Sequence, residues 1–203
     1  MALTTFVKIG NISNLSDARY CAGMMADVLG FNLQPESPDY ISPESFTEIT
    51  NWLSGVQFAG EFGDLDADSL NLLLPTYNVD ILEVTNALTL LSISHLSQKK
   101  IFRINADTPE SVESLPSVLE AVSAHCDWTT IHCEDEKLYD KIESIIWKSE
   151  NTDLLKGYDI NPDSVANMSS KWCGIVLEGS PEDQPGYKDY GIVMDVLEAL
   201  EDD

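Results

Sequence analysis

The sequence predicts an α/β protein with a compact (β/α)8 TIM-barrel fold, in one domain that spans residues 1–203. Short apolar segments alternate eight times with helical segments, which is the periodicity of a barrel of parallel strands. The length of 203 residues lies close to the lower end of about 200 residues for such barrels. A hydrophobic fraction of 43% is typical of a globular core.

The first stretch of the chain, residues 6–49, sets this alternation. Phe6, Val7 and Ile9 indicate a short strand, and Asn14 is placed to cap the helix that follows. Apolar residues at helical spacing then lead into a second apolar strand over residues 28–33. Two buried strands joined by one helix form a right-handed βαβ unit, from which a parallel sheet grows.

The remaining elements follow in the same order. Ser42 and Thr108 each precede a proline and an acid, a combination that favours the first turn of a helix. Pro116 lies inside the second of these helices and predicts a break or kink there. We expect further strands at 56–62, 79–84, 100–104, 127–133, 153–157 and 174–177, and helices at 42–53, 64–74, 88–96, from 108, at 137–147 and ending at Leu200.

Composition restricts the classes of partner. The chain has 35 acidic and 11 basic residues, a net charge of −24, which argues against nucleic acid and anionic membranes as partners. The same charge disfavours the attraction of an anionic substrate. A solubility adaptation is the simplest explanation for so many acidic residues.

The sequence shows no targeting segment. The start, MALTTF, lacks a basic region and a long apolar run, and no window is apolar enough for a membrane helix. The four cysteines show no CxxC pairing, so we expect free thiols in a cytoplasmic protein. We expect no cofactor and no metal.

A set of residues in fixed register over positions 8–41 matches a known family pattern. These residues are Lys8, Ile9, Ile12, Asn14, Leu15, Asp17, Ala18, Ala26, Asp27, Gly30, Phe31, Ser37, Pro38 and Ile41. They fit, without a gap, the motifs K-I-C-G-I-T, N-L-x-D-A, G-A-D-x-x-G-F and S-P-R-x-[VI], so the chain resembles the phosphoribosylanthranilate isomerases of tryptophan biosynthesis. Later matches are the strand KIFRI, the segment 161–165 and Pro185-Gly186-Tyr187-Lys188-Asp189. The resemblance implies a barrel whose site lies at the carboxyl ends of the strands.

Departures from the family pattern fall on the residues that the resemblance implies for catalysis. The family's reaction, an Amadori rearrangement, uses a cysteine base on strand one and an aspartate acid on strand six. Gly10 stands in place of the cysteine, and His132 stands in place of the aspartate. Asp39 replaces the arginine after Ser-Pro, and the family's histidine is missing from residues 83–86.

The phosphate-binding glycines are also reduced. Glu134-Asp135-Glu136 replaces the glycine-rich loop after strand six, and Glu178-Gly179-Ser180 replaces the small loop after strand eight. A carboxylate repels phosphate where backbone amides would bind it. Gly157 and Gly179 remain as candidates for a smaller anion nest.

His132 is the best remaining candidate for acid-base catalysis, because histidine titrates near neutral pH. A structural, hydrogen-bonded histidine at a strand end is the competing interpretation. Gly10 and Asn11 fit either a polar ligand contact or a tight turn that fills the emptied space.

The expected mouth of the barrel is acidic, with Asp39, Glu83, Glu134, Asp159 and Glu178 around His132 and Arg103. It fits either a site for a cation, amine or metal, or a solvated rim on an acidic protein. We expect any small-molecule ligand to contact Lys8, Asn11, Asp39, Glu83, Arg103, Gly157, Glu178 and Gly179.

Three functions stay open. The first is an isomerase-like barrel that has lost the isomerase reaction and acts as a binding or regulatory protein. The second is a functional or altered isomerase in which His132 supplies acid-base catalysis. The third is an interaction protein with Trp52, Trp147 and Trp172 on its partner surface, since tryptophan is enriched at binding hot spots.

Overall fold

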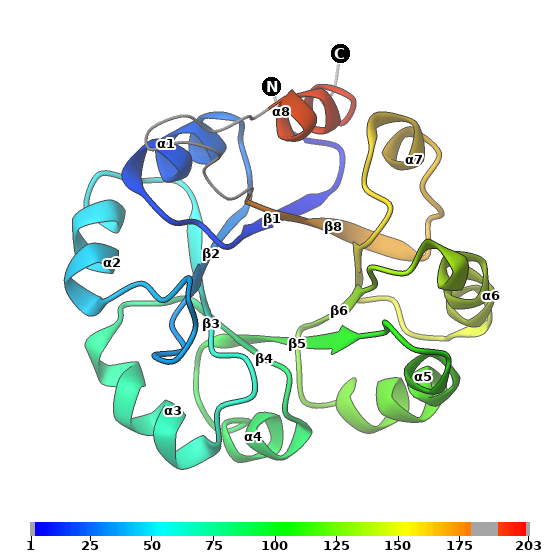
Figure 1. Ribbon diagram of the computed structural model, residues 1–203, viewed down its shortest axis with the longest axis horizontal. Coiled ribbons are helices and arrows are strands. Elements are labelled where there is room, and N and C mark those ends of the chain that lie inside the picture. Colours follow the sequence, from blue (N-terminus) through cyan, green and yellow to red (C-terminus); the bar gives the residue numbers. More distant parts are fainter. Residues whose placement is uncertain (1–2, 180–190, 202–203) are drawn as a thin grey trace.

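A computed structural model describes residues 3–179 and 191–201 and confirms the predicted barrel. Eight parallel strands close into a barrel in sequence order, and the helices form a ring around it (Figure 1). The strands are β1 (Phe6–Gly10), β2 (Val28–Asn32), β3 (Gln57–Glu61), β4 (Ile81–Val84), β5 (Lys99–Asn105), β6 (Trp128–His132), β7 (Leu154–Gly157) and β8 (Trp172–Glu178).

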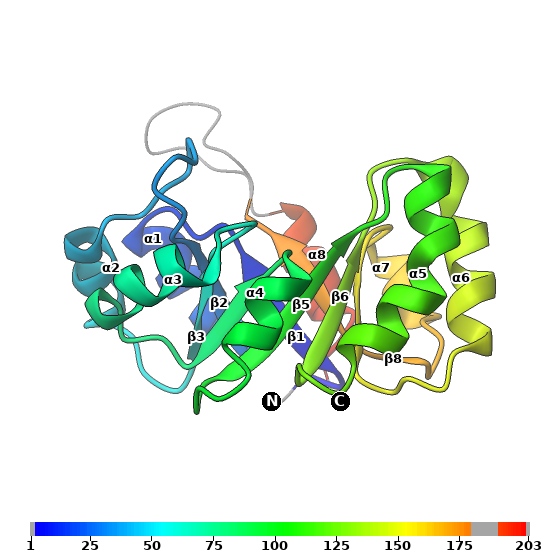
Figure 2. The same cartoon turned by 90° about the horizontal axis from the view of Figure 1, so that it is seen from below.

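The helices are α1 (Leu15–Gly23), α2 (Pro43–Thr50), α3 (Ala67–Leu73), α4 (Ala87–Ser92), α5 (Pro109–Val122), α6 (Tyr139–Lys148), α7 (Pro162–Ala166) and α8 (Gly191–Glu198). Two 3-10 turns extend two of these helices: η1 (Leu74–Thr76) directly follows α3, and η2 (Glu136–Leu138) directly precedes α6. Leu3 and Glu201 form an antiparallel bridge at the end where β1 begins (Figure 2). The predicted motif at 185–189 lies outside the described residues. No helix in the described ranges has the length and apolar character needed to cross a membrane.

The predicted helix caps are confirmed. The side chains of Asn14, Ser42 and Thr108 accept hydrogen bonds from the backbone amide three residues later. Of the break or kink predicted at Pro116, the break is wrong, because α5 runs without interruption through that residue, and the kink stays a prediction. Pro116 is exposed, while Val112, Leu115 and Leu119 on the buried face hold the helix against the barrel.

Aspartates at the amino ends of alternate strands fix the strand starts. Asp27 Oδ2 accepts from the Val7 amide at 2.8 Å, and Asp80 Oδ2 accepts from the Phe58 amide at 2.9 Å. Asp127 repeats the contact with the Lys100 amide at 2.8 Å. Each aspartate directly precedes one strand (β2, β4 or β6) and accepts a hydrogen bond from the strand before it (β1, β3 or β5). The same contact therefore occurs in three pairs of neighbouring strands.

The barrel interior changes from apolar to charged along the strands. An apolar cluster of Val28, Ala59, Ile81, Ile101, Leu155 and Val176 fills its middle level. Successive side chains alternate between the two faces of a strand, so the residue two positions later also points inward. These next inward positions are Gly30, Glu61, Glu83, Arg103, Gly157 and Glu178. The carboxyl ends of the strands therefore carry a charged level above an apolar one.

Candidate functional site at the carboxyl ends of the strands

A cavity of about 290 Å³ opens above the charged level. Its lining is polar: the amides Asn11, Asn32, Gln34 and Asn105, the carboxylates Asp39, Glu61, Glu83 and Glu178, and Gly63, Thr85 and Arg103. Another hollow, of about 220 Å³, lies near Cys126 and Asp153 at the amino ends of the strands and contains none of the predicted site residues. We take the first cavity as the candidate site because it holds most of the charged inward side chains.

Lys8 ties together two of the carboxylates below this cavity. Its register partners on β2 and β8 are Val28 and Val176, so it starts at the apolar level. The long side chain rises from there, and Nζ donates to Glu61 Oε1 and lies 2.8 Å from Glu83 Oε2. Lys8 is fully buried, and Glu83 is 3% exposed. The three side chains form a buried ion triad from β1, β3 and β4.

The charges of the triad shift each other's protonation. Burial acts to lower the pKa of Lys8, but the Glu61 and Glu83 carboxylates outweigh it, and the pKa is raised above its ordinary value. Lys8 therefore stays an ammonium at neutral pH. Burial raises the pKa of Glu61; Lys8 opposes this rise, and the negative Glu83 and Glu178 add to it.

Two glycines make the room that Glu61 occupies. A Cβ built on Gly10 would lie 2.6 Å from Glu61 Oε1, and a Cβ on Gly30 would lie 2.1 Å from the same atom. Glu61 Oε2 also accepts from the Asn11 amide at 3.2 Å. Asn11 has φ 53°, a left-handed conformation that asparagine tolerates. The space beside Gly10 is thus filled by a carboxylate from β3.

Sequence reasoning missed Glu61. A signal was present, since Gln57, Ala59 and Glu61 share one face of a predicted strand. That pattern places a charge inside the barrel, but it does not reveal that the carboxylate crosses to the glycines of β1 and β2.

Arg103 and Glu178 form a second ion pair across the mouth, from β5 to β8. Arg103 Nη1 lies 2.5 Å from Glu178 Oε1, and Arg103 Nε donates to Asn105 Oδ1 at 3.2 Å. Burial acts to raise the pKa of Glu178, but Arg103 and Lys8 outweigh it and hold that pKa below its ordinary value. Arg103, the cation in the cavity lining, is therefore already engaged by a carboxylate.

His132 ends β6, beside the cavity but outside its lining. Its Nε2 lies 3.8 Å from Glu134 Oε1, and its side chain is 18% exposed. Glu134 is 84% exposed and lies outside the cavity lining. The structure therefore brings Asp39, Glu83 and Glu178 together in one cavity and leaves the Glu134 carboxylate in solvent.

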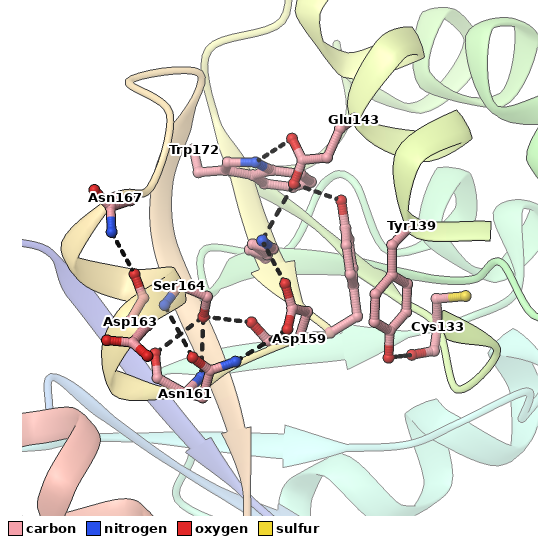
Figure 3. A network of polar contacts seen from close by, with 11 residues as sticks. Cys133, Tyr139, Glu143, Asp159, Asn161, Asp163, Ser164, Asn167 and Trp172 are labelled. Atoms are coloured by element: carbon pink, nitrogen blue, oxygen red, sulfur yellow. Dashed lines mark hydrogen bonds and ion pairs between the residues drawn. The ribbon is translucent and has the colours of Figure 1, made fainter. Parts of the chain in front are cut away.

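The loop between β7 and α7 is held by its own side chains (Figure 3). Asp159 Oδ1 accepts from Asn161 Nδ2 at 3.0 Å, and its Oδ2 lies 3.8 Å from Lys156 Nζ. Lys156 in turn pairs with Glu143 of α6. Asp159 therefore belongs to a network with Lys156, Glu143 and Asn161, which we call the outer network. The Ser164 amide donates to Asn161 Oδ1 at 2.9 Å. An amide that could face an anion at the start of α7 is thereby occupied.

The two glycines predicted for an anion nest have structural contacts. A Cβ on Gly157 would lie 3.0 Å from the Ile131 carbonyl oxygen, so this glycine allows close packing against β6. The Gly179 amide donates to the Gly10 carbonyl at 2.8 Å.

Metal ligation and the tryptophan surface were the other options raised by the sequence. The described residues contain no group of three or more His, Cys, Asp or Glu side chains that could hold a metal ion. Trp52 and Trp147 are 72% and 68% exposed. Trp172 is buried, and its Nε1 donates to Glu143 Oε2 at 3.2 Å, so it packs α6 onto the barrel (Figure 3).

Curated proteins similar to this chain include two phosphoribosylanthranilate isomerases. The N-(5'-phosphoribosyl)anthranilate isomerase of Geobacter sp. strain M21 is 30% identical over 196 residues, covering 91% of this chain and 92% of the relative. That of Sulfurovum sp. strain NBC37-1 is 29% identical over 122 residues, covering 60% and 62%. A scan against models of protein families finds no match.

Solved structures agree in fold. A phosphoribosylanthranilate isomerase from Thermotoga maritima has a TM-score of 0.75 at 18% identity and covers 97% of this chain and 98% of its own. The one from Thermococcus kodakaraensis has a TM-score of 0.75 at 13% identity, covering 98% and 100%.

Proposed function

The chain belongs to the phosphoribosylanthranilate isomerase family, and we propose that its barrel has lost the family's isomerisation and acts as a binding or regulatory protein. Its ligand site is the cavity at the carboxyl ends of the strands. The position of Glu61 carries this proposal. Its carboxylate occupies the space beside Gly10 where the resemblance implies a cysteine base.

The side chains around that space do not replace the cysteine directly. Lys8 is protonated, because its pKa is raised by two carboxylates, so it cannot accept a proton. The Asn11 side chain has no useful pKa. His132, the candidate acid, lies outside the cavity lining. The cysteine and the aspartate that the resemblance implies are therefore both absent, and the Glu61 carboxylate in the cysteine's place is bound by the Lys8 ammonium and the Asn11 amide.

The charges of the cavity disfavour the family's substrate as well. Asp39, Glu83 and Glu178 face the space where phosphate and a carboxylate would bind, and Arg103 is paired with Glu178. Two like charges about 4 Å apart repel by about 4 kcal/mol at an effective dielectric near 20. This exceeds the contribution of about 0.5–1.5 kcal/mol from one ordinary hydrogen bond.

A growth experiment tests the proposal. A bacterial strain that lacks phosphoribosylanthranilate isomerase is given this chain, and growth without tryptophan is followed beside a strain carrying an authentic isomerase. We expect no growth although the protein is present and folded, as checked by immunoblot and circular dichroism. Growth without tryptophan would refute the loss of activity.

An altered isomerase is the second candidate, and the raised pKa of Glu61 favours it. A carboxylate with a raised pKa in a cavity can serve as a general base, with His132 as the acid. The reaction would be the same type of proton transfer on a sugar that lacks phosphate.

The altered isomerase requires a substrate and two sensitive variants. Some aminosugar or related small molecule must be turned over, and both Glu61→Gln and His132→Ala must abolish that turnover while the fold is kept. If a substrate is found and either variant remains as active as the unmodified protein, the assignment of these two roles is wrong.

A further inference from the structure

We propose that the outer surface of α3 and α4 is a contact surface for a second copy of this chain, through which the protein forms a weak two-fold symmetric dimer. The surface is centred on Leu72 of α3 and on Leu88 and Leu91 of α4, and we call it the α3–α4 face. None of these leucines lines the cavity at the carboxyl ends of the strands, so the inference goes beyond the proposed function.

Helix α4 presents apolar side chains to solvent and buries a polar one. Leu88 and Leu91 lie three positions apart on one side of the helix and are 75% and 45% exposed. Thr89 is buried, and its hydroxyl donates to the Leu65 carbonyl at 2.7 Å. A surface helix ordinarily turns its polar residues outward. The exposed leucines of α4 therefore indicate a face that contacts another molecule.

Leu72 extends this surface onto α3, where it is 79% exposed. Helices α3 and α4 are in contact, and they lie side by side on the outside of the barrel (Figure 1, Figure 2). Single exposed apolar residues are ordinary on a monomer, whereas apolar residues gathered on one surface mark an interaction site. Three exposed leucines on two adjacent helices fit the second description.

The α3–α4 face also lies in a part of the chain with little charge. Segments 69–79 and 84–98 contain no Asp, Glu, Lys or Arg, although the chain has 35 acidic and 11 basic residues. Among the helices of the described residues, α4 alone carries no charged residue. The cores of protein–protein interfaces are depleted in charged residues in the same way.

The net charge of −24 favours a second copy as the partner. Two copies repel each other wherever their acidic surfaces meet, so they associate best through a surface that is free of like charges. In a two-fold dimer the same patch of both copies meets itself and must be self-complementary. An uncharged apolar face meets this requirement, whereas a basic partner would be attracted to the acidic surfaces elsewhere on the molecule.

Other exposed apolar residues lie beside charged ones. Trp52 shares a hollow with Glu48, and Ile192 lies on α8 together with Asp195. In a symmetric contact each of these carboxylates would approach its counterpart in the second copy, and such like-charge pairs are costly. These surfaces therefore suit a second copy less well than the α3–α4 face.

The size of the face predicts a weak association. Helices α3 and α4 have 7 and 6 residues, whereas a stable interface uses about 20–30 residues on each side. The full chain is therefore studied by sedimentation equilibrium from about 0.01 mM to about 1 mM, the range in which a small interface associates. We expect the average mass to rise with concentration from that of one chain toward that of two.

Variants at exposed positions locate the contact. Leu72→Glu and Leu88→Glu each place a carboxylate on the face, and each acts twice in a symmetric dimer. Both should weaken association by about tenfold or more and keep the fold, as circular dichroism checks. Ile192→Glu is the matched control, because it adds the same charge at an apolar position that is 70% exposed on α8. It should associate like the unmodified protein.

Salt gives a second measurement. Raising NaCl from about 0.01 M to about 0.1 M should strengthen the dimer, because it screens the repulsion between two acidic copies. Association that weakens with salt would instead rest on ion pairs and would overturn the inference.

A chain that stays monomeric over the whole concentration range would also overturn the inference. So would association that survives in both leucine variants, or an Ile192→Glu variant that loses as much affinity as they do, since the effect would then reflect net charge alone. The loss of isomerase activity is independent of these outcomes and is tested by growth without tryptophan.

Discussion

Glu61 links β3 to β1 and β2 at the carboxyl ends of the strands. The carboxylate belongs to β3, but its oxygens contact Lys8 and Asn11 and fill the space beside Gly10 and Gly30. A side chain at either glycine would collide with it. Substitutions of Glu61 and of either glycine should therefore have non-additive effects on the free energy of unfolding.

A double-mutant cycle tests this non-additivity. Gly10→Cys should destabilise the protein by about 1–3 kcal/mol, because the new side chain displaces Glu61 from Lys8. In a Glu61→Ala background the same substitution should cost clearly less, with a coupling of about 1 kcal/mol or more. Urea unfolding of the four proteins measures both quantities. Additive effects would show that Glu61 and position 10 do not share the space.

The buried lysine gives a second residue-level prediction. Lys8→Met should destabilise the fold by about 3–5 kcal/mol at neutral pH, because it leaves Glu61 and Glu83 without their cation. The folded-state pKa of Glu61 is raised, so the folded protein takes up a proton there more readily than the unfolded chain. The penalty on its charged form therefore grows as pH rises through that pKa and shrinks as pH falls.

The urea midpoint of unfolding is measured for Lys8→Met and for the unmodified protein at neutral pH and at about pH 5. We expect the loss of stability in Lys8→Met to be smaller at the lower pH. The Lys8→Met/Glu61→Gln double variant should recover part of that lost stability at neutral pH. A deficit that is the same at both values would mean that lost packing, and not charge, explains the effect.

At the scale of single elements, α5 is the informative case. Pro116 favours a break by local preference, but the buried face of α5 keeps the helix continuous. Local preference is thus overridden by burial of one apolar stripe, as expected when packing supplies most of the stability of a helix.

The destabilisation that Pro116 causes in α5 should be measurable. Pro116→Ala is expected to stabilise the protein by about 1–3 kcal/mol, because it restores a backbone donor and removes a ring from the helix interior. Ser114→Ala, at another exposed position of α5, is the matched control and should change stability by about 0.5 kcal/mol or less. Thermal unfolding of both variants makes the comparison, and a destabilised Pro116→Ala would show that α5 depends on the proline.

Prediction from the sequence succeeded where local chemistry decides the outcome. The caps at Asn14, Ser42 and Thr108 and the alternation of strands and helices follow from residue type and spacing. The site was harder, because its contacts join strands distant in sequence. The Lys8–Glu61 pair spans 53 positions, and the Arg103–Glu178 pair spans 75.

Side-chain direction at strand ends also limited the prediction. Asp159 was placed with the acidic mouth, yet it turns toward Lys156 and Asn161 in the outer network. Its backbone adopts φ 47°, a left-handed conformation that residue type alone does not fix.

The whole molecule carries a net charge of −24, so its charged surface should respond to salt. Raising NaCl from about 0.01 M to about 0.1 M shortens the screening length from about 30 Å to about 10 Å and weakens repulsion between acidic side chains. We expect the melting temperature to rise by several degrees over this range and then to level off. Differential scanning calorimetry records it, and an unchanged or lower melting temperature would contradict a stability limited by self-repulsion.

The central claim is that this member of the family does not catalyse the isomerisation, because the cysteine base is absent and the carboxylate in its place is bound to the Lys8 ammonium. Steady-state turnover of phosphoribosylanthranilate by the purified protein, followed by the loss of substrate fluorescence, tests it most directly. We predict no turnover above a protein-free control at any pH at which the protein is folded. Turnover of about 1 per second or more, an ordinary enzymatic rate, would contradict the claim.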